Sequence, residues 1–296
     1  MFNSKNKKVL VTGGSGFLGS HICDELTNSG YKVTIFDKKK SQYIKRNQKM
    51  LIGDIANPKD VYRASKNQNF IFHFAGVSDI DESNQNPLKA INNNINGTTN
   101  ILEAIKKNKN IKKFIFASSI YARSKQGGFY STTKRTCESL IEDYSQKYNL
   151  NYIVLRFGSL YGSRANNFNS IHKLIYQGIK YKKIEREGDG LEIRCYINVK
   201  DAAKICAEIL KKKYTCEYFN IEGKEKVSVK SVIKLIANKI RINKIFFNKK
   251  KVSNYHYKTN PYTYEVKEGK NFKLKKSIKL SSGINEIIKN LKNKYE

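Results

Sequence analysis

A strand, a glycine-rich turn and a helix in direct succession constrain the fold of this chain more than any other feature. Residues 8–12 (KVLVT) are typical of a buried strand, the following GGSGFLG leads into an amphipathic helix that ends near Gly30, and residues 32–37 (KVTIFD) form a second strand. Comparable apolar runs occur at 51–55, 69–76, 112–119 and 151–158, with helical stretches at 87–107 and 130–148. Strands without polar alternation, separated by helices, predict an α/β fold with a parallel sheet covered on both faces.

The glycines of the first turn predict a dinucleotide site. Gly13, Gly16 and Gly19 form a GxxGxxG pattern between the strand and the helix, and Asp37 ends the next strand. Such glycines allow a tight turn and let backbone amides approach a pyrophosphate at the helix N-terminus, as in doubly wound Rossmann-type sheets. An acid at the end of the second strand hydrogen-bonds the adenosine ribose, so Asp37 favours NAD over NADP. The lysines at 38–40 could meet a 2′-phosphate, although a solvated surface is their commoner role.

The second half of the chain has a looser pattern that predicts a smaller mixed α/β lobe. We expect an NAD-binding domain over residues 1–158 and a substrate-binding lobe over 159–296, whose strands could interleave with the first domain. The expected elements of this half are helices at 168–179, 201–212, 228–240 and within 281–295, a strand at 192–199, and an ordered, tyrosine-bearing loop within 248–276.

The composition excludes several classes of protein. Its 57 Lys and Arg against 25 Asp and Glu give a net charge of +32, but lysine is abundant along the whole chain and no nucleic-acid motif accompanies it, so we expect no nucleic-acid partner. Five cysteines without a CxxC pair and four scattered histidines predict reduced thiols and no metal site. Apolar runs are far shorter than the roughly 20 residues of a membrane span and no leader is recognisable, so we expect a cytoplasmic protein without a membrane partner.

Tyr130 and Lys134 are the first candidate catalytic residues. They stand four apart at the start of a predicted helix, so their side chains share one face. A tyrosine that acts as a base near neutrality needs its pKa lowered by roughly three units from about 10, which a nearby lysine and an oxidised nicotinamide could provide. An exposed Tyr and Lys pair on a helix surface is the alternative interpretation of this spacing.

Several further motifs occur in an order that resembles one enzyme family. In chain order they are TGGSGFLGSHI, GDI (53–55), HFAG (73–76), NINGTTNILEA, FASS, YSTTK, LRFGSLYGSR and GDGLEIRCYINVKDAA. Together they resemble the extended short-chain dehydrogenase/reductase family, in particular its branch of NAD-dependent nucleotide-sugar epimerases and dehydratases. The matches run almost the whole length of the chain.

This resemblance implies a role for each matching residue. Tyr130 would deprotonate a sugar hydroxyl, Ser119 would hydrogen-bond the same oxygen with Ser118 as the alternative register, and Lys134 would lower the pKa of Tyr130 and hold the ribose. Arg194 would pair with the sugar-nucleotide diphosphate. Further cofactor contacts implied by the motifs are Phe17, Leu18, Asp54, Ile55, Phe74, Ala75, Gly76, Asn94 and Ser118, and further substrate contacts are Ser78 and Ser159.

The sequence also departs from the family pattern. The segment SSIYARSKQGGFYSTTK is shorter than the usual connection between serine and tyrosine, Ser159 stands where the family often has Asn, and Ser163 stands where it usually has Pro. These positions belong to the walls of the sugar pocket. Ile120 and Tyr121 follow the serine where the 4,6-dehydratases have acidic residues, and this absence disfavours both dehydration and decarboxylation.

The resemblance therefore implies epimerisation of a nucleotide-diphosphate sugar at C4, through a transient 4-keto sugar, with NAD as cofactor. FAGVSDIDESNQNPLKAINNNINGT is especially similar to the corresponding stretch of UDP-glucose 4-epimerases. The alternatives are a nucleotide-sugar reductase or dehydrogenase that uses the same residues, and a non-catalytic regulatory protein that keeps the dinucleotide fold. The family further implies a homodimer formed through the helices at 87–107 and 130–148, and a place in polysaccharide precursor synthesis.

Overall fold

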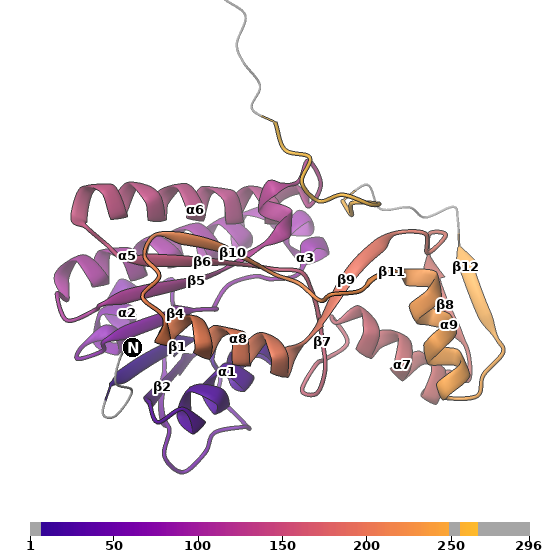
Figure 1. Ribbon diagram of the computed structural model, residues 1–296, viewed down its shortest axis with the longest axis horizontal. Helices are drawn as coiled ribbons and strands as arrows, with labels where there is room; N and C mark the ends of the chain where they lie inside the picture. Colours follow the sequence, from indigo (N-terminus) through magenta and orange to yellow (C-terminus); the bar gives the residue numbers. More distant parts are fainter. Residues whose placement is uncertain (1–6, 249–254, 266–296) are drawn as a thin grey trace, which may run out of the picture. The chain divides into compact units, whose positions relative to one another are not determined.

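A seven-stranded parallel sheet organises the computed structural model, which describes residues 7–248 and 255–265 (Figure 1). Its strands are β1 (Lys8–Thr12), β2 (Lys32–Asp37), β3 (Lys49–Ile52), β4 (Phe70–His73), β5 (Lys113–Ser119), β6 (Tyr152–Phe157) and β10 (Glu217–Ile221). Their order is β3-β2-β1-β4-β5-β6-β10, and every pair is parallel. The direction of the connections reverses between β1 and β4. The predicted doubly wound parallel sheet is confirmed.

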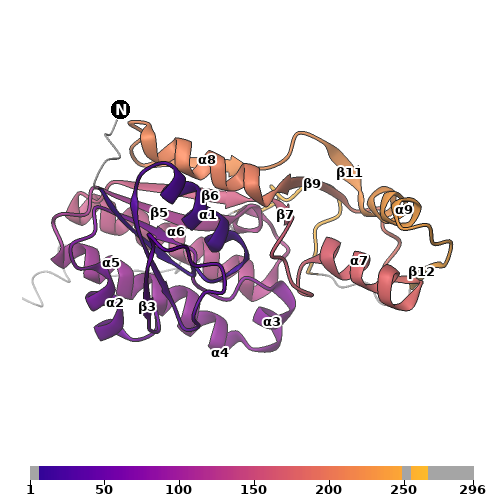
Figure 2. The same cartoon turned by 90° about the horizontal axis from the view of Figure 1, so that it is seen from below.

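Helices cover both faces of this sheet. On one face, α1 (Phe17–Asn28) and α8 (Val199–Lys211) lie side by side and share a core with the strands (Figure 2). On the other face lie α2 (Pro58–Ser65), α5 (Gly97–Lys107) and α6 (Gly128–Tyr148). Both faces of the central strands are therefore buried, which explains why their sequences are continuous apolar runs.

The stretch from 80 to 107 is helical but irregular. It consists of α3 (Ile80–Gln85), α4 (Pro87–Ala90), a π-helical segment η1 (Ile91–Asn96) and α5. Asn86 caps α4, because its side chain accepts a hydrogen bond from the backbone amide of Lys89. The single helix expected over 87–107 is thus interrupted by a π-helical segment, a feature that often occurs at functional sites. A short 3₁₀ turn, η2 (Ile120–Arg123), follows β5.

Two small sheets and two helices form the rest of the described chain. β7 (Ser159–Tyr161), β9 (Ile193–Asn198) and β11 (Lys226–Ser228) form one sheet, and β8 (Ile184–Glu187) pairs with β12 (Ile245–Asn248). The helices α7 (Ser170–Tyr181) and α9 (Val229–Lys239) pack on β8 and β12 around a separate apolar core.

Two elements from the second half of the chain pack with the first half, one as a strand of the large sheet and one as a helix that covers it. α8 packs on α1, and β10 extends the large sheet beside β6, so residues on both sides of position 158 contribute to the same layers. The boundary at residue 158 stays a prediction, and the helix expected within 281–295 lies outside the described residues. Among the helices of the described ranges, none has the length and apolarity needed to cross a bilayer.

Candidate active site

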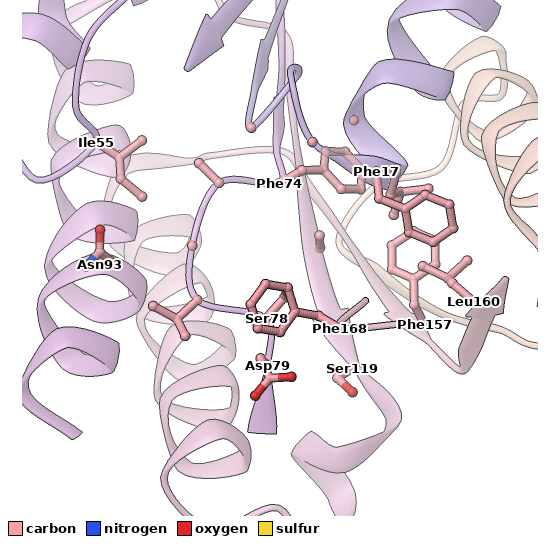
Figure 3. A pocket seen from close by; sticks show the side chains of 18 of the residues that line it. Phe17, Ile55, Phe74, Ser78, Asp79, Asn93, Ser119, Phe157, Leu160 and Phe168 are labelled. Carbon is pink, nitrogen blue, oxygen red and sulfur yellow. The ribbon is translucent and has the colours of Figure 1, made fainter. Parts of the chain in front are cut away.

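A cavity of about 650 Å³ opens at the carboxyl ends of β1, β2, β4 and β5 (Figure 3). This edge lies at the point where the strand connections reverse, which is where open α/β sheets bind ligands. The cavity brings together fifteen of the residues that the sequence indicated. They are Gly13, Gly16, Phe17, Leu18, Gly19, Asp37, Ile55, Phe74, Ala75, Gly76, Ser78, Ser118, Ser119, Tyr130 and Lys134.

Each glycine of the first turn has a separate steric reason. Gly13 has a φ of +71°, and a Cβ there would lie 2.6 Å from the backbone nitrogen of Ala75. A Cβ on Gly19 would lie 2.2 Å from the carbonyl oxygen of Gly13, so the third glycine allows the helix to approach the turn. Gly16 faces the cavity, where an added Cβ would meet only the Gly13 carbonyl, at 3.2 Å. The bare backbone beside the start of α1 therefore fits a pyrophosphate.

The adenosine end of the cavity carries the expected acid. The Asp37 carboxylate accepts hydrogen bonds from the backbone amides of Ser15 (3.1 Å) and Lys39 (3.2 Å), which fix its position. Lys38 also lines the cavity, but its ammonium pairs with Asp54 at 3.0 Å. Because this lysine is already paired, the site suits the ribose hydroxyls of NAD better than a 2′-phosphate.

Ser119 is the serine whose hydroxyl faces Tyr130. Successive side chains of a strand point to opposite faces, so Ser118 and Ser119 at the end of β5 cannot both point the same way. Ser118 donates a hydrogen bond to the buried carboxylate of Glu138, at 2.5 Å. Ser119 instead interacts with the phenol of Tyr130. This arrangement agrees with the first of the two registers considered from the sequence.

Burial changes the pKa values of Tyr130 and Lys134. The pKa of Tyr130 is raised, mainly because the phenol is desolvated. The hydrogen bond with Ser119 acts in the opposite direction, and the charge of Asp79 adds to the increase. Desolvation also lowers the pKa of Lys134, whose Nζ donates to the carbonyl of Ala117 at 2.7 Å and lies 6.0 Å from the Tyr130 ring centre. The sequence predicted a lowered tyrosine pKa. The protein alone produces the opposite shift, because it buries the phenol without bonding a cation to it.

Asn94 lies behind the cavity and does not line it. It is buried in η1, where its amide donates to the carbonyl of Val77 and to the hydroxyl of Thr133, each at 3.0 Å, and accepts from the Val77 amide at 2.7 Å. These bonds fasten the loop after β4 to α6, the helix that carries Tyr130. A Cβ on Gly76 would lie 2.5 Å from the Asn94 side-chain oxygen, so the loop needs glycine there.

The other predicted residues outside the cavity are Asp54, Ser159 and Arg194. Asp54 accepts from the backbone amide of Ala56 and pairs with Lys38. Ser159 lies in β7, between two residues that do line the cavity. Arg194 is buried and donates to the carbonyl of Ile193 at 2.8 Å.

Residues 255–264, which we call the carboxy-terminal strap, cover the short connection between Ser119 and Tyr130. The carbonyl of Tyr255 accepts a hydrogen bond from the Gly127 amide at 2.7 Å, and His256 Nδ1 lies 3.0 Å from the Tyr121 hydroxyl. Tyr257 packs in one cluster with Tyr121 and Tyr130. The Arg194 guanidinium lies over the Tyr257 ring, 4.1 Å from its centre. The strap, which is part of the loop expected within 248–276, thus forms a wall beside Tyr130, whereas residues 249–254 and 266–276 of that loop lie outside the described residues.

The cavity also contains residues that the sequence reasoning missed. Phe168, on the loop before α7, is 75% exposed and still lines the cavity. The most unexpected is Asp79, because no motif indicated a carboxylate beside Tyr130. Other residues that line the cavity and that the sequence did not indicate are Glu82, Lys89, Asn93, Phe157, Leu160, Asn166 and Asn169. The shortened connection before Tyr130 and the tyrosines of the strap were the signals for an altered pocket wall.

The strand order, the glycine turn and the Ser119, Tyr130 and Lys134 group define a dinucleotide-dependent enzyme of the short-chain dehydrogenase/reductase class. Within this class, the chain belongs to the NAD-dependent epimerase/dehydratase family, whose sequence model matches residues 9–222. Enzymes of this family depend on NAD, and the glycine turn and Asp37 fit that cofactor.

The comparison with known proteins supports this family at the level of sequence and of structure. A protein of Bacillus subtilis (strain 168), named as an uncharacterized UDP-glucose epimerase, is 31% identical over 269 residues, covering 78% of this chain and 81% of the relative. A solved UDP-N-acetylglucosamine 4-epimerase from Methanobrevibacter ruminantium M1 has a TM-score of 0.78 and 26% identity, over 86% of this chain and 89% of its own. A UDP-glucuronic acid 4-epimerase from Bacillus cereus, solved with UDP-glucuronic acid and NAD, has a TM-score of 0.79, the same identity and the same coverage.

Proposed function

We propose that this protein interconverts the C4 epimers of a nucleotide-diphosphate sugar, with NAD as a retained cofactor. The observation that carries the proposal is the contact between the Ser119 hydroxyl and the Tyr130 phenol inside the same cavity that the glycine turn lines. A sugar hydroxyl placed between these two groups can lose its proton to one and stay held by the other. The similarity to several nucleotide-sugar 4-epimerases supports the choice of reaction.

Different residues of the chain would bind the cofactor and transfer the proton. The backbone at Gly13 and Gly16 would hold the pyrophosphate of NAD, Asp37 the adenosine ribose, and Lys134 the nicotinamide ribose. NAD held there would supply reversible hydride transfer with the sugar carbon and, in its oxidised form, a positive charge. Tyr130 Oη takes the proton of the C4 hydroxyl and later gives it back, while Ser119 Oγ hydrogen-bonds the same oxygen and keeps it in place as the carbon becomes planar.

A test of this proposal uses the purified protein without added cofactor. We would incubate it with UDP-glucose, UDP-galactose and their N-acetyl counterparts and follow the sugars by NMR. We expect a C4 epimer to form with no net change of absorbance at the NADH wavelength. We expect Tyr130→Phe to retain NAD and to lose at least 100-fold in kcat, because the proton acceptor is removed while the ring stays in place.

Other results of this test would favour a different activity. Conversion only in the presence of added NADH or NADPH, with its stoichiometric oxidation, would indicate a reductase that uses the same residues. Bound NAD together with no conversion of any nucleotide sugar would favour a regulatory dinucleotide-binding protein. Loss of NAD from Tyr130→Phe would mean that the residue serves cofactor binding rather than proton transfer.

We also propose that the protein is a homodimer formed through α5 and α6. These helices pack side by side on one face of the sheet, and the outer side chains of α6, among them Tyr148 at 42%, are exposed. A dimer would bury this face as a bundle of four helices. Light scattering at micromolar concentration should give twice the chain mass of 34.1 kDa, and a monomer would contradict the proposal.

A further inference from the structure

A carboxylate that has no ion-pair partner among the described residues lies at the Ser119 and Tyr130 end of the cavity. Asp79 follows the loop after β4 and caps α3, because its Oδ1 accepts a hydrogen bond from the Glu82 amide at 2.7 Å. This bond fixes the side chain of a half-buried residue. In Figure 3 the Asp79 carboxylate and Ser119 lie in the same part of the cavity. Asp79, Ser119 and Tyr130 all line this cavity, and the charge of Asp79 contributes to the raised pKa of Tyr130.

The cations that line the cavity are already engaged. Lys38 pairs with Asp54 at 3.0 Å, and Lys89 pairs with Glu82 at 2.6 Å. Lys134 is buried and bonded to a backbone carbonyl. Within residues 7–248 and 255–265 no ion pair involves Asp79. A ligand that placed a second negative charge near Tyr130 would therefore meet Asp79, and each lysine among the described residues that line the cavity already has an ion-pair or hydrogen-bond partner.

We propose that Asp79 is a specificity-determining residue, which makes the enzyme select nucleotide sugars whose ring carries no carboxylate and reject uronic acids. This inference rests on the proposed function, because the sugar must be held with its C4 hydroxyl at Ser119 and Tyr130. In that position the substituent on the neighbouring carbon C5 lies within a few ångströms of the reacting oxygen. A CH₂OH group there can donate a hydrogen bond to Asp79, whereas a carboxylate is repelled by it.

The variant Asp79→Asn removes the negative charge of residue 79 and leaves the local structure intact. Asparagine is as good an N-cap as aspartate and keeps the oxygen that accepts from the Glu82 amide, so α3 is preserved. Asp81→Asn is the matched control, since Asp81 belongs to the same helix but is exposed and does not line the cavity. Both substitutions remove one negative charge and therefore change the net charge of the protein equally.

The experiment compares kcat/KM for UDP-glucose and UDP-glucuronic acid in the wild type and the two variants. We expect the wild type to prefer UDP-glucose, and Asp79→Asn to raise the uronate-to-hexose ratio of kcat/KM at least tenfold, which corresponds to about 1.4 kcal/mol. Asp81→Asn should leave the ratio within twofold. A wild type that turns over both sugars equally, or a ratio that Asp79→Asn does not change, would overturn the proposal.

Failure of the proposed reaction can be told apart from failure of this inference. If the wild type epimerises neither sugar, the dissociation constants of UDP-glucose and UDP-glucuronic acid are measured by calorimetry on the NAD-loaded protein. Tighter binding of the uronate by Asp79→Asn, with UDP-glucose binding unchanged within twofold, would still support charge selection. Equal effects on both ligands would overturn it. A product lighter by one water would also overturn it, because Asp79 would then take part in elimination.

Discussion

Glu138 should be one of the residues on which the stability of the sheet beside the active site depends most. It is 5% exposed and accepts hydrogen bonds from the Arg156 guanidinium at 2.9 and 2.7 Å and from the Ser118 hydroxyl at 2.5 Å. These contacts join α6 to β6 and to the end of β5, directly beside Ser119. Replacing Glu138 with Ala would leave the guanidinium of Arg156 mostly buried without its counter-charge.

The expected loss follows from this burial. Removing one partner of a buried ion pair costs about 3–5 kcal/mol, because the remaining charge stays desolvated. For a chain of this size each kcal/mol lowers the melting temperature by roughly 2 °C, so Glu138→Ala should melt about 6–10 °C below the wild type. Asp143→Ala, an exposed acid on the same helix, should change the melting temperature by less than about 1 °C.

Urea unfolding followed by circular dichroism, in the presence of saturating NAD, measures this effect with the cofactor contribution held constant. A third variant tests the cause. Glu138→Leu combined with Arg156→Met replaces both charges by apolar side chains and should recover most of the lost free energy of unfolding. A loss below about 1 kcal/mol for Glu138→Ala, or no recovery in the double variant, would refute the argument that an uncompensated buried charge is responsible.

Two other predictions concern the cofactor turn and the core behind it. Gly19→Ala should lower NAD affinity at least 100-fold, because its Cβ would lie 2.2 Å from the Gly13 carbonyl; the NAD content of the purified variant measures this, and a wild-type content would contradict it. Burial, with a smaller contribution from Lys134, lowers the pKa of His73 to about 3. Below pH 6.5 the unfolded chain therefore binds a proton at His73 that the folded chain does not bind. The free energy of unfolding should for this reason decrease as the pH falls. Between pH 7 and pH 5 His73 should lower the free energy of unfolding, measured with urea, by about 2 kcal/mol. His73→Gln should not show this part of the pH dependence.

The parts of the site that the sequence predicted are those that local rules determine. The turn at Gly13 needs a positive φ, Asp37 ends its strand, and parallel strands place all their carboxyl ends at one edge of the sheet. The assignment of Ser119 over Ser118 needed the structure, because alternation requires opposite faces without saying which face meets α6.

The parts that the sequence could not predict depend on contacts between distant segments. β10 pairs with β6 across some sixty residues of intervening chain, and nothing in the apolar run at 217–221 distinguishes an added edge strand from part of a separate lobe. The carboxy-terminal strap covers the shortened connection before Tyr130 from more than a hundred residues away. Asp79 caps the short helix α3, and only the cavity shows that it lines the same space as Tyr130.

The pKa of Tyr130 links these observations to the cofactor. The spacing of Tyr130 and Lys134 is correct for a catalytic pair, but the structure raises the pKa of the phenol and lowers that of the ammonium, so burial favours the neutral form of both groups. The charge of Asp79 raises the phenol pKa further. A positive charge brought into the cavity would lower the pKa of the phenol and so oppose the effects of burial and of Asp79 on Tyr130, whereas an uncharged, reduced nicotinamide would not. In the proposed reaction we therefore expect Tyr130 to be a stronger base with the oxidised than with the reduced cofactor bound, which would couple proton removal from the sugar to the state that can accept its hydride.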